Sequence, residues 1–137
     1  MKKRIGFFLF ALLLTGVLTA CGGESKNSDS EEYDSSNAVS VVFSENEIEV
    51  PEEDGCQISG TDLTIGQSGT YLVSGSCGDG SVTVKKGTED VTIVLNGISL
   101  TSADSAPLVC GKNSRVDIVA ASGTTNTLAD TEANNDE

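Results

Sequence analysis

Carboxylates and cysteines are the side chains of this sequence best suited to chemistry, and histidine is absent. The 137 residues include 21 Asp and Glu, four Cys and eight Lys and Arg. Histidine is the commonest general base and transition-metal ligand, so its absence argues against nucleophilic triads and zinc sites. After Arg4, the chain has one arginine, Arg115. We therefore predict a chain that is not an enzyme, with no catalytic residues and no cofactor.

From residue 54 onward, the carboxylates lie in segments rich in Gly, Ser and Asn, which are typical of turns. Several acids gathered at such turns could bind calcium through oxygen ligands. Isolated turn carboxylates instead accept local backbone hydrogen bonds, and the chain has no EF-hand spacing and no Gly- and Asp-rich nonapeptide array. We favour the second interpretation and predict no metal site at the candidate positions, which are Asp54, Asp62, Asp79, Glu89, Asp90, Asp104 and Asp130.

Three cysteines follow Cys21, and an odd number cannot pair completely within one chain. Cys56 and Cys77 are 21 residues apart, close to one pass of a coiled sheet whose strands lie about 4.8 Å apart. That separation suits a disulfide, so we predict a Cys56–Cys77 bond in an oxidising compartment. Cys110 lies on an apolar alternation, which favours a small buried hydrophobe. The alternatives are three free thiols or a bond that involves Cys110.

The first twenty residues have the pattern of a bacterial signal peptide. Lys2, Lys3 and Arg4 precede an uncharged apolar run over residues 5–20, which is too short to span a bilayer as a helix. The run ends in LTAC, residues 18–21, which resembles the lipobox of bacterial lipoproteins. The resemblance implies cleavage before Cys21 and acyl chains, palmitate among them, on its thiol and new amino terminus. The expected location is the cell membrane or the outer membrane, lipid-anchored and extracytoplasmic.

Composition divides the remaining chain into three parts. Residues 21–39 are rich in Ser, Asn, Asp and Glu and predict a disordered linker after the lipidated cysteine. Residues 40–130 suffice for one small domain. Residues 131–137 are a polar tail, and a truncated C-terminus is one interpretation of it. The formal net charge of −13 excludes nucleic acid as a partner, because such a surface repels polyphosphate.

Short runs that alternate apolar and polar residues predict strands throughout the domain, and no window has the apolar period of a helix. Small polar residues and Gly separate these runs. The apolar positions predict one buried set, made of Leu63, Ile65, Val82, Val84, Val91, Ile93, Leu95, Ile98, Leu100, Leu108, Cys110, Val116, Ile118 and Ala120.

Asn96-Gly97 lies inside the run VTIVLNGISL, residues 91–100, and locally predicts a β-hairpin. However, residues 81–84 resemble 106–110, and residues 91–97 resemble 116–123, both at a shift of about 25 residues, which is typical of a repeat. That is the length of one turn of a parallel β-helix, in which Asn-Gly would form a corner. We expect Ile93, Leu95, Ile98 and Leu100 to point inward and Thr92, Val94 and Ser99 outward. An antiparallel β-sandwich is the alternative fold.

Four motifs in order resemble a family of carbohydrate-binding domains of secreted and cell-surface bacterial proteins, first catalogued as a domain of unknown function. They are GTYLVSG at 69–75, VTIVLNGI at 91–98, TSADSAPLV at 101–109 and VDIVAASGTTNTL at 116–128. The resemblance implies a right-handed parallel β-helix. The sequence departs from the family at Ser105-Ala106-Pro107, where a glycine and a small residue are usual, and it stops soon after the last motif, where members continue.

The resemblance also implies carbohydrate binding, with a polysaccharide or glycan as partner. Sugars commonly stack on aromatic rings, but residues 40–137 contain only Phe43 and Tyr71, and we favour a core position for Tyr71. Ligand-binding residues stay open, with polar ladders of Thr, Ser, Asn and Asp as the expected surface. We predict a lipid-anchored, non-catalytic binding module. The alternatives are a structural or adhesive surface protein and a remnant of a β-helix polysaccharide-degrading enzyme.

Overall fold

The computed structural model describes residues 33–51 and 55–131, and this part of the chain is all-β, which confirms the predicted class. It contains no helix long and apolar enough to cross a membrane. The predicted signal peptide, Cys21, the first part of the linker and Asp54 lie outside the described residues, as does the tail beyond residue 131.

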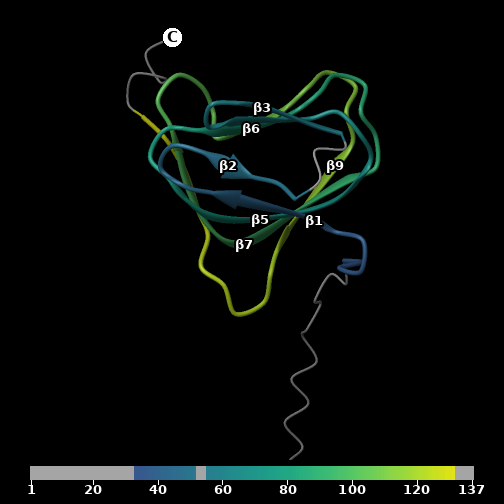
Figure 1. Cartoon of the computed structure of the whole chain (residues 1–137). Coiled ribbons are helices and arrows are strands. Elements are labelled where there is room, and N and C mark those ends of the chain that lie inside the picture. The colour runs from purple at the N-terminus through teal and green to yellow at the C-terminus, as the bar shows by residue number, and fades with distance from the viewer. Residues whose placement is uncertain (1–32, 52–54, 132–137) are drawn as a thin grey trace, which may run out of the picture.

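The described residues form ten strands in two sheets that face one another (Figure 1). The large sheet contains β1 (Val39–Phe43), β2 (Ile48–Glu49), β5 (Gly69–Cys77), β7 (Val91–Ser102), β9 (Val116–Ala120) and β10 (Thr127–Asp130). The small sheet contains β3 (Cys56–Ser59), β4 (Asp62–Ile65), β6 (Ser81–Val84) and β8 (Leu108–Cys110).

From β4 to β9, the chain alternates between the two sheets, and β10 then follows β9 in the large sheet. Each of these strands pairs in parallel with a strand from another pass of the chain. Antiparallel pairing occurs where β2 joins β1 and β3 joins β4. Val82 pairs with Leu108, and Ile93 pairs with Ile118. Both offsets agree with the repeat shift expected from the sequence. The earlier pass, in which Leu63 pairs with Val82, is shorter.

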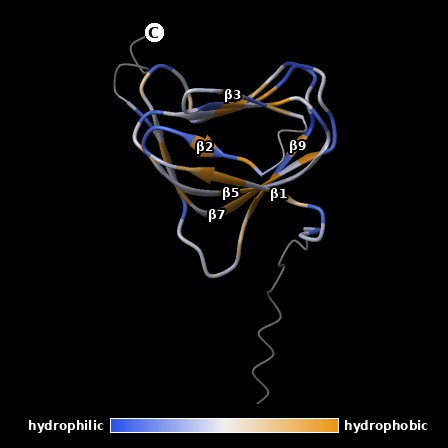
Figure 2. Cartoon of the chain, viewed as in Figure 1, coloured by the Kyte–Doolittle hydropathy of each residue, from blue (hydrophilic) through white to orange (hydrophobic). Residues whose placement is uncertain are grey.

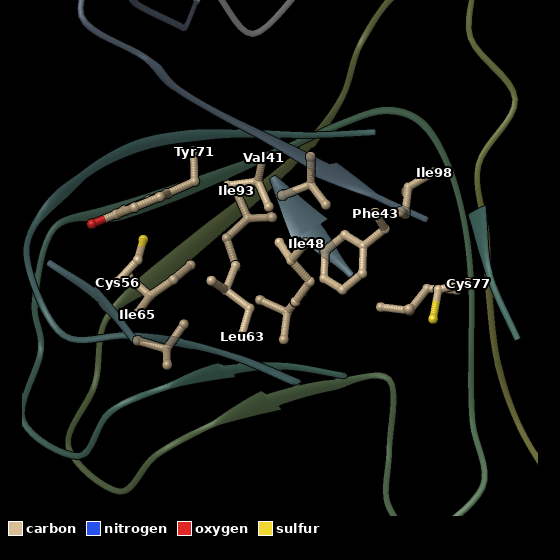
Figure 3. Close-up of a cluster of buried hydrophobic side chains, with 14 of the residues drawn as sticks. Val41, Phe43, Ile48, Cys56, Leu63, Ile65, Tyr71, Cys77, Ile93 and Ile98 are labelled. Carbon is tan, nitrogen blue, oxygen red and sulfur yellow. The ribbon is translucent and has the colours of Figure 1, made fainter. Parts of the chain in front are cut away.

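The core lies between the sheets and is mostly aliphatic (Figures 2 and 3). Parallel register stacks equivalent positions, so Tyr71 lies beside Ile93, and Cys77 lies beside Leu100. Most of the predicted buried set is buried or packs against the core as half-buried side chains. The half-buried members are Leu95, Leu108 and Val116.

The predicted buried set is wrong for three residues of the last pass. Cys110, Ile118 and Ala120 are exposed, and Ile118 keeps 48% of its surface in solvent. Each pairs with a residue of an earlier strand on one side, but β8 and β9 lie at sheet edges among the described residues, so no described strand covers their other side. For these inward-facing side chains, the missing strand on one side leaves surface in contact with solvent.

The alternation predicts an outward, solvent-facing Val94, but this side chain is fully buried. It lies between Leu72 of β5 and Val119 of β9. These neighbours make an apolar row on the outer face of the large sheet, and its members shield one another from water. Of the expected inward residues, Ile93, Ile98 and Leu100 are buried, and Leu95 packs partly buried against the core.

Asn96-Gly97 forms neither the locally predicted hairpin nor the corner expected for a β-helix turn, because β7 continues as one strand through both residues. The register with β5 shifts there, since Val73 pairs with Leu95 but Gly75 pairs with Ile98. Gly97 has a φ of 79°, which Gly adopts without a Cβ clash. The Asn126 side-chain oxygen accepts hydrogen bonds from the Gly97 and Ile98 amides at 2.8 and 3.0 Å. These bonds join the second and fourth motifs.

Crosslinking between strands tests the parallel register of β7 with β9 and β10. Thr92 pairs with Asp117, and Ser99 pairs with Thr127. Cysteines at either pair should crosslink with a short bifunctional thiol reagent, because paired strands lie about 4.8 Å apart. The assay would use a chain in which serine replaces Cys21 and the exposed Cys110, with crosslinked peptides identified by mass spectrometry.

The exchanged pairs, Thr92 with Thr127 and Ser99 with Asp117, provide the control. They are far out of register and should not crosslink. If β7 paired antiparallel with β9 and β10, the exchanged pairs would crosslink and the matched pairs would not. That result would contradict the parallel register.

Candidate ligand-binding groove

Three loops stack at the end of the molecule where β4, β6 and β8 end. They are residues 66–68, 85–90 and 111–115, which we call the corner. The Lys85 amide donates to the Ile65 carbonyl at 2.8 Å, and the Gly111 amide donates to the Val84 carbonyl at 2.8 Å. These backbone bonds continue the small sheet into the loops, so the corner has a defined shape.

Two adjoining pockets along the corner form one groove. Their volumes are about 340 and 690 Å³, and they share Gly66, Gln67 and Lys85. The smaller is lined by Gly55, Cys56, Gln57, Thr64, Gly66, Gln67 and Lys85. The larger is lined by Gly66, Gln67, Ser68, Lys85, Lys86, Gly87, Thr88, Glu89 and Asp90. Hollows around β1 and β2 are lined largely by apolar residues such as Val42 and Ile48, and so offer fewer hydrogen bonds.

Tyr71 anchors the loop that carries Gln67. The Tyr71 hydroxyl donates to the Gln67 backbone carbonyl at 3.0 Å, while its ring is 1% exposed in the core (Figure 3). The Gln67 side chain is therefore available to the groove, because the bond uses its backbone. This confirms the core interpretation of Tyr71 and removes it as a stacking platform for a ligand.

Burial raises the pKa of the Tyr71 hydroxyl, and the nearby Cys56 thiol adds to the rise. Burial likewise raises the pKa of Cys56. Both groups lie at the same end of the core (Figure 3), and both are neutral near pH 7. They support the floor of the groove but bring no charge to it.

The groove presents amides, hydroxyls, ammonium groups and carboxylates at the surface. Gln57 and Gln67 supply donors and acceptors together, and Thr64 adds a hydroxyl. Phe43 is 2% exposed, so it offers no accessible ring. This chemistry fits a ligand rich in hydroxyl groups that binds by hydrogen bonds and not by stacking.

The six sequence-predicted carboxylates among the described residues are not gathered in one place. Asp62 accepts a hydrogen bond from the Ser81 hydroxyl at 2.7 Å, and Asp79 accepts one from the Ala103 amide at 3.0 Å. Of these six, Glu89 and Asp90 line the groove. Within residues 33–51 and 55–131, no group of three or more His, Cys, Asp or Glu side chains could hold a metal ion.

The three described cysteines are free thiols. Cys56 pairs with Ile65 in the small sheet, whereas Cys77 pairs with Leu100 in the large sheet. They lie at opposite ends of the core (Figure 3). The structure therefore does not contain the disulfide expected from their spacing in the sequence, because that spacing connects different sheets and not neighbouring strands.

Sequence reasoning missed the groove residues Gln57, Gln67, Lys85 and Lys86. One feature of the sequence could have pointed to a surface loop there. Lys85 and Lys86 begin the segment KKGTED, a polar turn between two apolar runs. The sequence did not show which loop lies beside this segment, because only the strand register places residues 85–90 next to residues 111–115.

Removal of the Tyr71 hydroxyl should weaken the fold. Tyr71→Phe loses the bond to Gln67, so the free energy of unfolding at pH 7 should fall by about 1 kcal/mol. Each of these two groups has a higher pKa in the folded protein than in the unfolded chain. It therefore contributes its full stabilisation below the unfolded pKa, and this stabilisation is lost as the pH rises through the folded pKa. Wild-type stability should therefore decline above the ordinary values of 9.0 for Cys56 and 10.0 for Tyr71.

Urea unfolding followed by circular dichroism between pH 7 and 11 measures both effects. Tyr71→Phe should decline less steeply above pH 10 than the wild type. Tyr33→Phe, which removes another tyrosine hydroxyl, should stay within about 0.5 kcal/mol of wild type at pH 7. If the free energy of unfolding fell equally steeply with pH for Tyr71→Phe and wild type, the decline above pH 10 would not come from the Tyr71 hydroxyl.

Comparison with known proteins identifies the family of this chain. A family model described as "Carbohydrate-binding domain-containing protein" matches residues 59–137. A carbohydrate-binding domain-containing protein of Acetivibrio thermocellus is 31% identical over 123 residues, which is 89% of this chain and 43% of that protein. The chain thus spans less than half of this relative, and no solved structure matches. The chain belongs to the carbohydrate-binding domain-containing protein family.

Proposed function

We propose that this protein binds carbohydrate through the corner groove. Family membership carries the proposal, and the groove supports it with Gln57, Thr64 and Gln67, whose amides and hydroxyl can bond sugar hydroxyls. Because the Phe43 and Tyr71 rings are buried, binding relies on hydrogen bonds that compete with water. Affinity for a single sugar is therefore low, and a polysaccharide gains by contacting several positions of the groove.

We propose a right-handed parallel β-helix as the finer description of the fold. In its favour, the chain from β4 to β9 alternates between two facing sheets, and each of these passes pairs in parallel with the one before. Crossovers between parallel strands are right-handed in nearly all proteins. An antiparallel sandwich would instead pair neighbouring strands in opposite directions. The exchanged crosslinks described for Thr92, Ser99, Asp117 and Thr127 discriminate these folds.

We propose that the protein is a lipid-anchored extracytoplasmic module without catalytic activity. The leader of residues 1–20 and Cys21 within LTAC support the anchor. The sequence without histidine supports a non-catalytic role, since the usual general base is missing. Release of reducing or unsaturated ends from a polysaccharide by the purified chain would contradict this role.

A glycan array with the detergent-solubilised full chain tests binding. Thr64→Val and Gln67→Ala each remove a hydrogen-bonding group from the groove, and each should weaken binding about five- to tenfold. Thr92→Val provides a matched control, because it makes the same change on the outer face of the large sheet and should leave affinity unchanged.

Two outcomes would contradict the proposal in different ways. If no glycan bound, a structural or adhesive role without sugar binding would be favoured. If Thr64→Val and Thr92→Val weakened binding equally, the site would lie outside the groove.

Lipidation is tested by expression in a bacterial host fed labelled palmitate. Cys21→Ser should abolish both the label and retention in the membrane fraction, because the thiol is the acceptor. Cys110→Ser changes an exposed cysteine of the domain and should keep both. Label retained by Cys21→Ser would contradict the lipid anchor.

A further inference from the structure

The basic side chains of the described residues are concentrated at the corner. Residues 33–51 and 55–131 carry eleven carboxylates and four basic groups, and all four basic groups lie in the loops 85–90 and 111–115. They are Lys85, Lys86, Lys112 and Arg115. We propose that the corner groove selects acidic glycans, in which carboxylate, sulfate or phosphate groups pair with these cations. This inference rests on the proposed carbohydrate binding and names its ligand class.

The two basic loops are joined by backbone contacts, so the loop of Lys112 and Arg115 lies beside the loop of Lys85 and Lys86. Of the four cations, Lys85 and Lys86 line the groove itself. The Gly87 amide donates to the Lys112 carbonyl at 3.1 Å, and the Arg115 amide donates to the Thr88 carbonyl at 3.0 Å. Gly111 packs so closely on the loop of residues 85–90 that a Cβ at position 111 would lie 2.5 Å from the backbone nitrogen of Lys86. The contact holds Lys86 and Lys112 on adjacent layers of the corner.

The alternating path of the chain sends most acids to the opposite end of the molecule. Strands β4, β6 and β8 end at the corner, so their first residues and the turns before them lie at the far end, where Asp62, Asp79 and Asp104 occur. The β1–β2 turn lies there too, since the Glu45 carboxylate approaches Gly78. The resulting charge separation steers an anionic ligand toward the corner despite the net negative charge.

The four cations are available to a ligand. All four side chains are exposed, and none forms an ion pair with another described residue. Glu89 and Asp90 line the same groove, and Asp117 follows Arg115 on β9. Counting these three carboxylates, the described residues in and beside the corner carry one net positive charge. The carboxylates restrict the ligand to anionic groups spaced to avoid them.

A glycan fits this surface better than a membrane or nucleic acid does. Cations adjoin the Gln67 amide and the Ser68 hydroxyl in one groove, which suits a ligand that bears hydroxyls and scattered anions. A phosphate polymer with one charge per residue would meet Glu89 and Asp90 as well as the lysines. A flat anionic bilayer would contact the rim and leave the groove unused.

The test compares a charged glycan with its neutral form. Titration calorimetry of the detergent-solubilised full chain would use oligogalacturonate and the same oligomer fully methyl-esterified, with sulfated dextran oligomers as a second acidic probe. The acidic probes should bind at least about tenfold more tightly than the ester at low salt, and the advantage should shrink as salt rises. Lys86→Gln, Lys112→Gln and Arg115→Gln should each weaken acidic binding about two- to fivefold.

Asp104→Asn provides the control, because it changes net charge by one unit at the far end. It should alter affinity for the acidic probe less than twofold. An equal and opposite effect of Asp104→Asn and Lys86→Gln would show that only net charge matters and would overturn the proposed site.

The remaining outcomes separate this inference from the proposed function. If neutral and acidic glycans bound equally and Thr64→Val weakened the binding of both kinds, the proposed carbohydrate binding would be supported and the acidic selectivity would be contradicted. If no glycan of either kind bound, both the carbohydrate binding and the acidic selectivity would be contradicted. Binding to phosphatidylglycerol vesicles that Lys86→Gln abolished, without glycan binding, would reassign the corner to membrane contact.

Discussion

Parallel register between successive passes of the chain is the constraint on which this structure depends. The core has no tryptophan, and aliphatic side chains fill it by stacking equivalent positions, as in the row of Ile65 and Val84. Backbone hydrogen bonds between parallel strands hold each position over its equivalent. A shift by one residue would turn the apolar set toward solvent. The same register decides which loops meet at each end of the sheets.

The loops inherit their arrangement from this stacking. Gly75 shows how tightly the layers approach, since a Cβ there would lie 2.0 Å from the Phe43 carbonyl oxygen. At the corner, similarly close contact between Gly111 and Lys86 joins two basic loops. The groove is therefore a consequence of the repeat, and its side chains come from segments that are distant in sequence.

The position of a strand in the stack affects how far the apolar residues of its inner face are buried. Ile93 is buried because β5 and β9 pair with β7 on both sides, whereas Ile118 occupies the equivalent position on β9 and is exposed. Alternation predicted the same environment for both residues. It reports which face a side chain occupies, but it does not report how many neighbouring strands cover that face.

Sequence alone determined the all-β class, the inward face of most strands and the spacing of the later passes, because alternation is a local signal and the repeat recurs along the chain. It did not determine the fate of Asn96-Gly97, where a strong hairpin signal yields to a strand bulge tied to Asn126. It also did not locate the groove. Only the tertiary structure brought Gln67, Lys85 and Lys112 to one corner, because passes of unequal length decide which loops align.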